Sequence, residues 1–491
     1  MSGSSRDGAA KAAARRTPPG DAPVPAPSGW GRVARPDGPS SVSTVLTLLA
    51  QRSGPNAVFE AAARAHGPVT HVRMAGEHVY IVSDPALVTD VFLTHARDVM
   101  KGRGLQAARP VLGNGLLTSE GEFHLRQRRL AQPAFHRARI ASYADQMVTE
   151  SAHVGDLWVD GAEVDMVDEM TSLTFAIVGR TLCGTDLTGD ARAFGDSLEE
   201  LISGFGQLSS FGIERLVRAL PKGRRLLAQV TELDAVVQRI IDEHRADAAR
   251  GVDRDDLLSW LIAARDDESA ATYGERMSDE QLRDEVMTFV LAGHETTAMA
   301  LSWTWWLLSC NPLAASRLHD ELERLLRADD GTWRAPTFDD IPAMPWTHAV
   351  VAESIRLYPP AWIMGRRLLT DLEVGGWQLP SGSIVLGSPW ILQRDPALWD
   401  SATSFMPERW LDADGAYDES APGQPRGAFV PFGFGNRRCI GEQFAWTEAM
   451  LVLATLASHW TASLVPGSVV DTLAAVTLRP KHGLPMTVHR R

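Results

Sequence analysis

The residue whose type and surroundings best suit chemistry is Cys439, which lies in the glycine-rich segment 432–441 just ahead of a helix-forming stretch. Glycines tolerate φ > 0 and carry no Cβ, so such a backbone packs closely against a flat partner and aims N–H groups at the sulfur. The helix N-terminus and the flanking Arg437 and Arg438 favour the thiolate. The segment predicts a stabilised, electron-rich anion, which serves either as a metal ligand or as a reactive nucleophile.

A second unusual segment is 292–297, where polar residues occupy the centre of a long apolar helical pattern. Gly in a helix interior costs roughly 1 kcal/mol relative to Ala, and Thr competes for backbone carbonyls. One interpretation is a kink or tight helix packing at Gly293. The other is a notch formed by a widened turn, where the carboxyl of Glu295 and the hydroxyl of Thr296 relay protons.

A third candidate is the pair Glu353 and Arg356, which share a helix face because they lie three residues apart. Pairs with this spacing are usually solvated and of small energetic value, and the chain has two more, Glu280/Arg283 and Glu321/Arg324. Context distinguishes the first pair: a Leu-Tyr-Pro-Pro sequence follows it directly, and segment 405–410 follows downstream.

Basic side chains form a fourth group. His124 and Arg128 are four residues apart in segment 121–130 and point the same way on a helix, while Arg366 and Arg367 precede a short strand pattern. Their simplest interpretation is a solvated surface. The alternative is an anionic ligand, whose carboxylates need such partners.

In their order along the chain, these motifs resemble the cytochrome P-450 family. The family signature Phe-x-x-Gly-x-Arg-x-Cys-x-Gly is filled at every specified position, namely Phe432, Gly435, Arg437, Cys439 and Gly441. The segment 292–297, the Glu353/Arg356 pair and segment 405–410 match in the expected order, and the resemblance covers about residues 53–491.

The resemblance implies a cofactor, haem b, with Cys439 as the axial thiolate and metal ligand, a ligand that favours O–O cleavage. It implies that Glu295 and Thr296 are the catalytic acid–alcohol pair, with Thr297 as a neighbour. Glu353, Arg356 and Arg409 form a supporting triad behind the cysteine loop. The cofactor-binding residues implied are Cys439, His124, Arg128, Arg366 (or Arg367 in its place), Ala292, Phe432, Gly435, Arg437 and Gly441.

The implied function is a monooxygenase that uses O2 to hydroxylate or epoxidise an apolar small molecule, with a terpenoid or fatty-acyl compound as the guessed substrate. Segments 101–117, 204–220, 289–293 and 361–364 are the expected pocket. The rivals are a peroxygenase or isomerase on the same haem and a non-catalytic haem gas-binding protein. No dinucleotide-binding motif follows a strand pattern. Electrons are therefore expected from a ferredoxin with its reductase, or a flavodoxin, steered by Arg126, Arg129 and Arg438.

Composition agrees with an ordinary globular protein, because 44% of the 491 residues are hydrophobic and 22% are charged. A net charge of −13 argues against nucleic-acid binding. The three cysteines form no CxxC pair, which favours a reducing compartment, the cytoplasm. Cys183 and Cys310 are expected in the core.

The elements that must position these residues are mostly helices. A capping box opens the longest helix, expected over 278–310, whose polar centre argues against a membrane span. Hairpins are expected over 69–83 and over 477–489, the latter turning at Gly483, and helices over 163–183 and 193–203. The predicted fold is mainly α (α+β), with small peripheral sheets. Residues 1–40 are expected to be a flexible leader without a transmembrane anchor, and residues 41–491 one catalytic domain.

Overall fold

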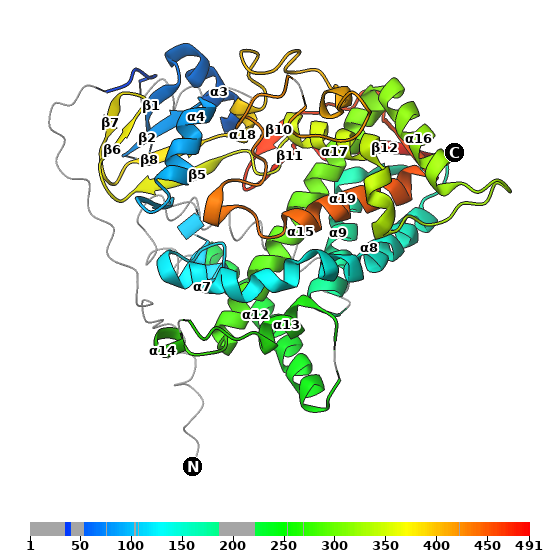
Figure 1. The fold of residues 1–491 in the computed structure, drawn as a ribbon, viewed down its shortest axis with the longest axis horizontal. Helices are drawn as coiled ribbons and strands as arrows, with labels where there is room; N and C mark the ends of the chain where they lie inside the picture. The colour runs from blue at the N-terminus through cyan, green and yellow to red at the C-terminus, as the bar shows by residue number, and fades with distance from the viewer. Residues whose placement is uncertain are drawn as a thin grey trace.

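The computed structural model describes residues 35–40, 54–74, 76–102, 105–106, 108–185, 221–252, 254–268, 270–421 and 423–491. Helices make up most of this part of the chain, and the strands form small sheets at its periphery (Figure 1). The predicted fold class is confirmed. The helix expected over 193–203 and the pocket segment 204–220 lie outside the described residues.

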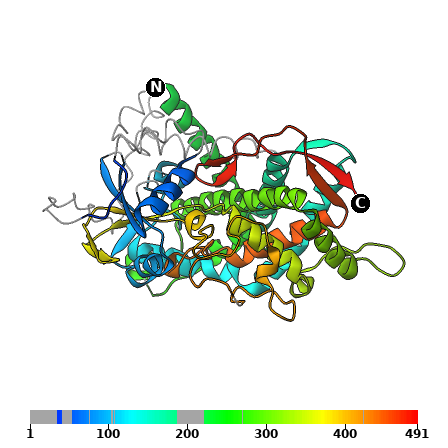
Figure 2. The same cartoon turned by 90° about the horizontal axis from the view of Figure 1, so that it is seen from above.

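The long central helix is α15 (Asp279–Cys310), which runs through the middle of the helical body (Figure 2). The predicted capping box is present: Gln281 N donates to Ser278 Oγ, and Ser278 N donates to Gln281 Oε1. Helices on several sides bury the middle of α15, namely α9 (Met166–Leu182), α12 (Pro221–Ala249), α17 (Pro345–Leu357) and α19 (Glu442–Ala457).

Gly293 serves the packing of α15 on α9. A Cβ at Gly293 would lie 2.9 Å from Cγ2 of Val178, closer than side chains tolerate. Residues 279–310 are α-helical without interruption, so the predicted widened turn is absent. Tight helix packing therefore accounts for Gly293, whereas the proton relay by Glu295 and Thr296 stays a prediction.

Further helices surround this bundle. They are α3 (Pro55–His66), α4 (Pro85–Thr89), α6 (Arg109–Leu112), α7 (Gly121–Ala131), α8 (Arg137–Leu157), α13 (Leu257–Ala263), α14 (Ala270–Tyr273), α16 (Pro312–Leu326) and α18 (Pro389–Leu392), with the single-turn elements η1 (Asp90–Thr94), η2 (Gln132–Phe135), η3 (Phe338–Ala343), η4 (Pro407–Trp410) and η5 (Gly435–Arg437).

The largest sheet has the strand order β1-β2-β8-β5-β3, built from β1 (Val69–Met74), β2 (Glu77–Val82), β8 (Ile384–Gly387), β5 (Met364–Leu368) and β3 (Val99–Lys101). The predicted hairpin over 69–83 is confirmed as β1 and β2. A second hairpin pairs β6 (Leu372–Val374) with β7 (Trp377–Leu379). Asp37 O accepts a hydrogen bond from His71 N on β1 at 3.1 Å, so the described end of the expected leader lies along this sheet. The proposed division into leader and domain stays a prediction.

Two predictions of secondary structure are wrong, namely the hairpin over 477–489 and the start of the helix over 163–183. The C-terminal hairpin does not form, because β11 (Leu478–Pro480) pairs with β10 (Thr472–Ala474), while β12 (Pro485–Arg490) lies between β4 (Glu163–Asp165) and β9 (Trp460–Leu464). Gly483 does turn the chain, with φ 70°, but a turn does not determine which strands pair. The strand β4 also replaces the start of the helix expected over 163–183.

The two cysteines expected in the core differ. Cys183 is buried, as predicted, but Cys310 is exposed. Cys310 is the last residue of α15, where the helix reaches the surface and ends before Asn311. An apolar helical pattern predicts burial of a helix face and does not tell where along the helix the core ends.

Candidate functional site

The cysteine loop is shaped by two glycines with positive φ, Gly433 at 73° and Gly435 at 53°. Cys439 N donates to Phe432 O at 2.8 Å, which closes the loop around η5. Gly441 is the N-cap of α19, and its N–H points at the sulfur of Cys439. The chain therefore presents a single thiol at the start of α19, as the glycine pattern predicts.

The Cys439 side chain is solvent-accessible, yet protein atoms crowd around its sulfur. This desolvation raises the pKa of the thiol to about 11, whereas the Gly441 N–H, Arg128 and Arg438 lower it. The helix start and Arg438 therefore act on the thiol as predicted, Arg437 is not among the groups that lower its pKa, and burial outweighs them all in the protein alone. A metal ion bound to the sulfur would reverse this balance, because a coordinating thiol is deprotonated outright.

One face of α7 holds the cysteine loop from the side. His124 Nε2 lies 3.3 Å from Asn436 O, and Arg128 Nη1 donates to Arg438 O at 2.7 Å. The pair therefore points the same way, as its spacing predicts, but both side chains contact loop carbonyls. Burial lowers the pKa of His124 to about 2, so its imidazole is neutral.

The predicted brace is assembled in the buried interior behind the loop. Arg356 donates to both oxygens of Glu353, Nε to Oε2 at 2.7 Å and Nη2 to Oε1 at 2.8 Å, and both side chains are 0% exposed. Arg409 Nε donates to Glu353 Oε1 at 3.1 Å. Trp410 Nε1, which sequence reasoning missed, adds a bond to Oε2 at 3.0 Å. The carboxylate is thus satisfied from several sides, as a buried charge requires.

Gln393 connects this brace to the cysteine loop, and nothing in its local sequence indicates the role. Its Nε2 donates to the carbonyls of Ile355 and Arg356 at 3.1 Å, and its Oε1 accepts from Val430 N at 3.1 Å. Arg356 Nη1 donates in return to Gln393 O at 2.6 Å. The end of α17 is therefore tied to the backbone that leads into the loop.

A cluster of cations lies beside the loop. Lys101 Nζ is buried and donates to the carbonyls of Leu116 and Ser119, and Arg437 Nη1 donates to Ser119 O at 3.0 Å. The positive charge of Arg366 acts on Lys101. Burial lowers the pKa of Arg366 to about 10. Among the described residues the carboxylates that face these three cations are Glu120, paired with Arg437, and Glu285.

The choice between Arg366 and Arg367 follows from their opposite faces on β5. Arg367 is buried and forms an ion pair with Glu77 of β2. Arg366 faces the cysteine side, where its guanidinium lies 5.0 Å from the ring centroid of Phe92 and donates to Gly365 O. No carboxylate in the described part of the chain forms an ion pair with Arg366. Its position therefore suits an added anion better than that of Arg367.

The centre of α15 presents a small accessible face. Ala292 is exposed and Gly293 and Thr296 are partly exposed, although the helix is otherwise buried here. Thr296 Oγ1 donates to Ala292 O at 2.8 Å. A hydroxyl is therefore presented where little side-chain bulk covers the helix.

Glu295 points away from that face. Its carboxyl is 7% exposed and accepts a hydrogen bond from Thr477 Oγ1 at 2.6 Å. Arg479 Nη2 on β11 lies 3.9 Å from the same oxygen. The acid and the alcohol are adjacent in sequence, but the structure brings Glu295 to Thr477 rather than to Thr296 Oγ1. Thr477 and Arg479 escaped sequence reasoning, because their local pattern indicates only a short strand.

These features fit a haem. Cys439 supplies a sulfur ligand, and Ala292 and Thr296 leave part of the surface of α15 uncovered by bulky side chains. Burial lowers the pKa of Lys101 well below its ordinary range and raises the pKa of Glu285 to about 7. Arg366 and Arg437 still outnumber the carboxylate Glu120, so the cluster has cationic charge to offer the propionates.

The expected basic patch needs a correction. Arg126 is 0% exposed and donates inward to the carbonyls of Gly274 and Arg276, so it cannot contact a partner. Arg129 and Arg438 are exposed, but each faces carboxylates, Asp266 and Glu268 for Arg129 and Glu442 for Arg438. The helical spacing that places His124 and Arg128 on the loop turns Arg126 into the core.

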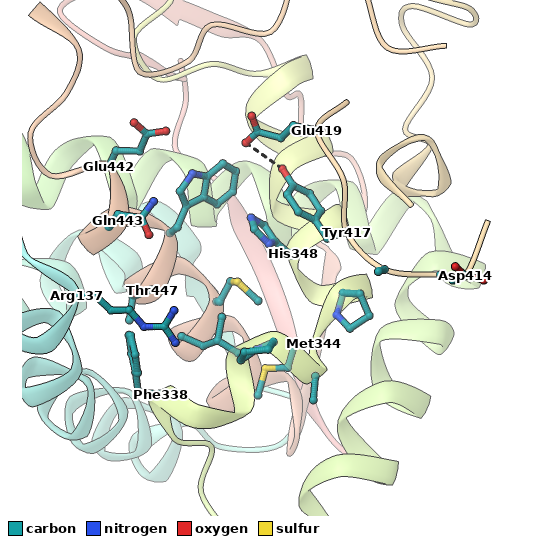
Figure 3. A pocket seen from close by; sticks show the side chains of 18 of the residues that line it. Arg137, Phe338, Met344, His348, Asp414, Tyr417, Glu419, Glu442, Gln443 and Thr447 are labelled. Atoms are coloured by element: carbon teal, nitrogen blue, oxygen red, sulfur yellow. Dashed lines mark hydrogen bonds between the residues drawn. The ribbon is translucent and has the colours of Figure 1, made fainter. Parts of the chain in front are cut away.

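A cleft of about 800 Å³ lies next to the cysteine loop, between η3, α17, α19 and residues 414–419 (Figure 3). The rings of His348 and Tyr417 stack within it, and the Tyr417 hydroxyl donates to Glu419. None of the predicted pocket segments within the described residues lines this cleft.

Comparisons with known proteins agree with this geometry. The sequence profile of the cytochrome P450 family matches residues 36–484. Cyclooctatin synthase of Streptomyces melanosporofaciens is 39% identical over 90% of this chain and 93% of its own. Cyclooctat-9-en-7-ol 5-monooxygenase of the same organism and pentalenene oxygenase of Streptomyces avermitilis are each 35% identical, over 84% and 86% of this chain and 86% and 90% of their own.

The fold comparison gives the same answer. The crystal structure of a cytochrome P-450 haem domain matches with a TM-score of 0.78 and 25% identity, covering 96% of this chain and 98% of that one. Within the described residues, every helix is too short or too polar to cross a membrane. The chain belongs to the cytochrome P-450 family, as a monooxygenase that binds haem through a cysteine thiolate and takes electrons from a redox partner to oxidise a hydrophobic substrate.

Proposed function

We propose that the protein hydroxylates or epoxidises a cyclic terpenoid, with Cys439 as the haem ligand. The observation that carries the substrate class is the similarity over most of the chain to cyclooctatin synthase and to two oxygenases that act on terpenoids, cyclooctat-9-en-7-ol 5-monooxygenase and pentalenene oxygenase. The exposed small face of α15 agrees with a substrate that offers apolar surface and few polar groups.

Bound haem supplies the redox chemistry that activates O2 and transfers one of its oxygen atoms. Separate regions of the chain bind the haem and hold the cysteine loop in place. Arg366, Arg437 and Lys101 hold the propionates, while His124 and Arg128 fix the cysteine loop from α7. Glu353, Arg356 and Arg409 keep the loop anchored to α17. Ala292, Phe432, Gly435 and Gly441 border the macrocycle.

Thr296 and Glu295, both on α15, deliver protons to the reacting oxygen. The Thr296 hydroxyl is partly exposed and donates to Ala292 O, so it can turn to a reacting oxygen without leaving a buried group unpaired. Glu295 is held by Thr477 and reaches Thr296 only after that bond opens. Proton delivery therefore requires a side-chain rotation at Glu295.

Electrons come from a ferredoxin and its reductase, or a flavodoxin, in the cytoplasm. The unpaired cysteines among the described residues agree with a reducing compartment. Arg129 and Arg438 are the exposed members of the predicted patch, and they would contact an acidic partner in competition with their own ion-pair partners Glu268 and Glu442. Charge reversal at both positions should weaken the salt dependence of electron transfer.

The decisive experiment is a carbon monoxide difference spectrum of the reduced protein, with Cys439→Ser beside it, followed by spectral titration and turnover with a ferredoxin system. A thiolate-type band that Cys439→Ser loses supports the ligand assignment, and its absence from the wild type overturns it. A cyclic terpene hydrocarbon should shift the resting spectrum and yield an oxygenated product. Conversion of a long-chain fatty acid in preference to the terpene would refute the substrate class.

A further inference from the structure

The hairpin of β10 and β11 brings Thr477 to Glu295, yet its own two strands cannot fix it there. Each strand has three residues, and among the described residues they form a sheet only with each other. A two-stranded hairpin on its own is marginally stable in water. Its outer side, with Leu473 and Val476, is exposed. The position of Thr477 must therefore be fixed by contacts on the inner side of the hairpin.

Trp303 of α15 holds this inner side. Its indole Nε1 donates to Leu478 O at 3.0 Å, and both residues are fully buried. An indole N–H can only donate and a buried carbonyl needs a donor, so each group satisfies the other. Trp303 follows Glu295 by about two turns of the same helix. The hairpin thus contacts α15 at two points, through Trp303 and through Glu295 (Figure 1).

The ring of Trp303 is itself held in place by other aromatic rings. It stacks on the ring of Tyr358, with the centroids 4.3 Å apart and an angle of 18° between the planes. Tyr358 is the C-cap of α17, the helix that carries the buried brace. Trp306 packs edge-on against both rings, at centroid distances of 5.6 Å from Trp303 and 5.2 Å from Tyr358. The donor to Leu478 O is therefore fixed to α15 and to the end of α17.

A second indole holds the other end of the turn between β10 and β11. Trp362 Nε1 donates to Ala475 O at 3.0 Å. Leu478 N donates to Pro360 O at 3.0 Å, so the segment that follows α17 contacts the turn at both ends. Within the turn, Ala475 N donates to Thr477 O at 3.0 Å. The backbone on both sides of Thr477 is therefore bonded to neighbouring segments, while its side chain points to α15.

We propose that Trp303 and Trp362 are positioning residues for the Glu295 carboxyl. Their indole N–H groups clamp the turn of the hairpin, so that the Thr477 hydroxyl stays within hydrogen-bond reach of that carboxyl. Arg479, 3.9 Å from the same carboxyl oxygen, is carried by the same hairpin. The clamp thereby determines where the carboxyl points before it turns to deliver a proton. The inference rests on the proposed role of Glu295 in proton delivery.

Removing one indole N–H should loosen the turn and leave the carboxyl itself unchanged. Trp303→Phe keeps an aromatic ring against Tyr358 but leaves Leu478 O without its donor. Trp362→Phe does the same to Ala475 O at the other end of the turn. Because the two variants act at different places, Trp362→Phe still tests the inference if Trp303→Phe does not fold.

Both variants should change coupling, meaning product formed per reductant consumed, severalfold and in the direction in which Thr477→Val changes it. Since all three weaken the same contact, Trp303→Phe combined with Thr477→Val should add little to Thr477→Val alone. Trp346→Phe is the matched control, because it removes a buried indole whose Nε1 donates to Ala314 O at 3.1 Å, between α17 and α16. It should lower the Tm comparably and leave coupling unchanged.

A measurement on the resting protein separates the clamp from turnover. The infrared difference between wild type and Glu295→Gln identifies the carboxyl bands of this side chain, whose frequencies depend on the hydrogen bond that it accepts. These bands should shift in Thr477→Val and, in the same direction, in Trp303→Phe and Trp362→Phe, but not in Trp346→Phe.

Unshifted bands in a folded Trp303→Phe or Trp362→Phe would overturn the inference. Where Glu295→Gln impairs coupling, tryptophan variants of the clamp that couple like Trp346→Phe would overturn it as well. Normal coupling in Glu295→Gln, together with shifted bands in the clamp variants, would instead refute the proposed role of Glu295 and support the clamp.

Discussion

Thr477 Oγ1 donates to Glu295 Oε1 at 2.6 Å, so a side chain 182 residues further along the chain holds the carboxyl at the centre of α15. Thr477 is itself 4% exposed, and Arg479 adds a positive charge 3.9 Å from the same oxygen. The segment around β11 therefore determines which way the candidate acid points.

Thr477→Val should release Glu295 while preserving side-chain volume. The loss of one hydrogen bond to a buried carboxyl is expected to cost about 1–3 kcal/mol in the free energy of unfolding. Coupling should change as well, since the carboxyl can then turn toward Thr296. Urea unfolding and the product-to-reductant ratio measure the two effects. Thr461→Val, at a partly exposed position of β9, is the control, and equal behaviour of the two variants would contradict this role.

Glu353→Gln should destabilise the protein strongly, because it leaves Arg356 charged and buried without its bidentate partner. Breaking a buried pair in this way costs about 3–5 kcal/mol. Thermal unfolding and the haem content of the purified protein measure it. Glu243→Gln removes an exposed pair with Arg239 and should cost about 0–1 kcal/mol. Similar losses in both variants would show that the brace is no stronger than a surface contact.

The sequence predicted those parts of the site whose partners follow a spacing rule. The cysteine loop is readable because glycines, arginines and the helix start lie within ten residues, and Glu353 with Arg356 because three residues span one helix turn. The capping box at Ser278 belongs to the same class. Such local rules need no knowledge of which elements pack together.

Features that depend on tertiary packing could not be predicted. Gln393 acts because its side chain reaches Val430 and the end of α17, and neither contact leaves a local signal. Arg126 is buried because α13 and the segment before α15 cover its side of α7, which charge alone would not suggest.

Arg366→Met and Arg367→Met should separate haem binding from folding. Arg366 is a partly buried cation without an ion pair among the described residues, so Met there should leave the stability of the apoprotein unchanged or higher while haem escapes faster. Arg367→Met removes the ion-pair partner of Glu77. This variant should therefore lower the stability of the apoprotein, with a smaller effect on the rate of haem loss. Haem transfer to apomyoglobin and urea unfolding of the apoprotein measure the two properties. The reverse pattern would move the propionate contact to Arg367.

Glu285 should make stability depend on pH near neutrality. Burial raises its pKa from the ordinary 4.5 to about 7, although Leu116 N and the Gln127 side chain donate to its oxygens. The native state therefore binds more protons than the unfolded state between these two values. This contribution is fully present below the unfolded pKa and is lost as the pH rises through the folded one.

Wild-type protein should accordingly lose a few kcal/mol of stability from this group as the pH rises from about 4.5 to 7, since one pKa unit corresponds to 1.36 kcal/mol. In Glu285→Gln this decrease of the free energy of unfolding with rising pH should disappear, whatever the absolute stability of the variant. Urea unfolding of the apoprotein at a series of pH values measures the slope, with Glu280→Gln on the exposed first turn of α15 as the control. An unchanged slope in Glu285→Gln means that the carboxyl is ionised throughout this range, and the cation cluster beside the cysteine loop would then carry less net positive charge for the propionates.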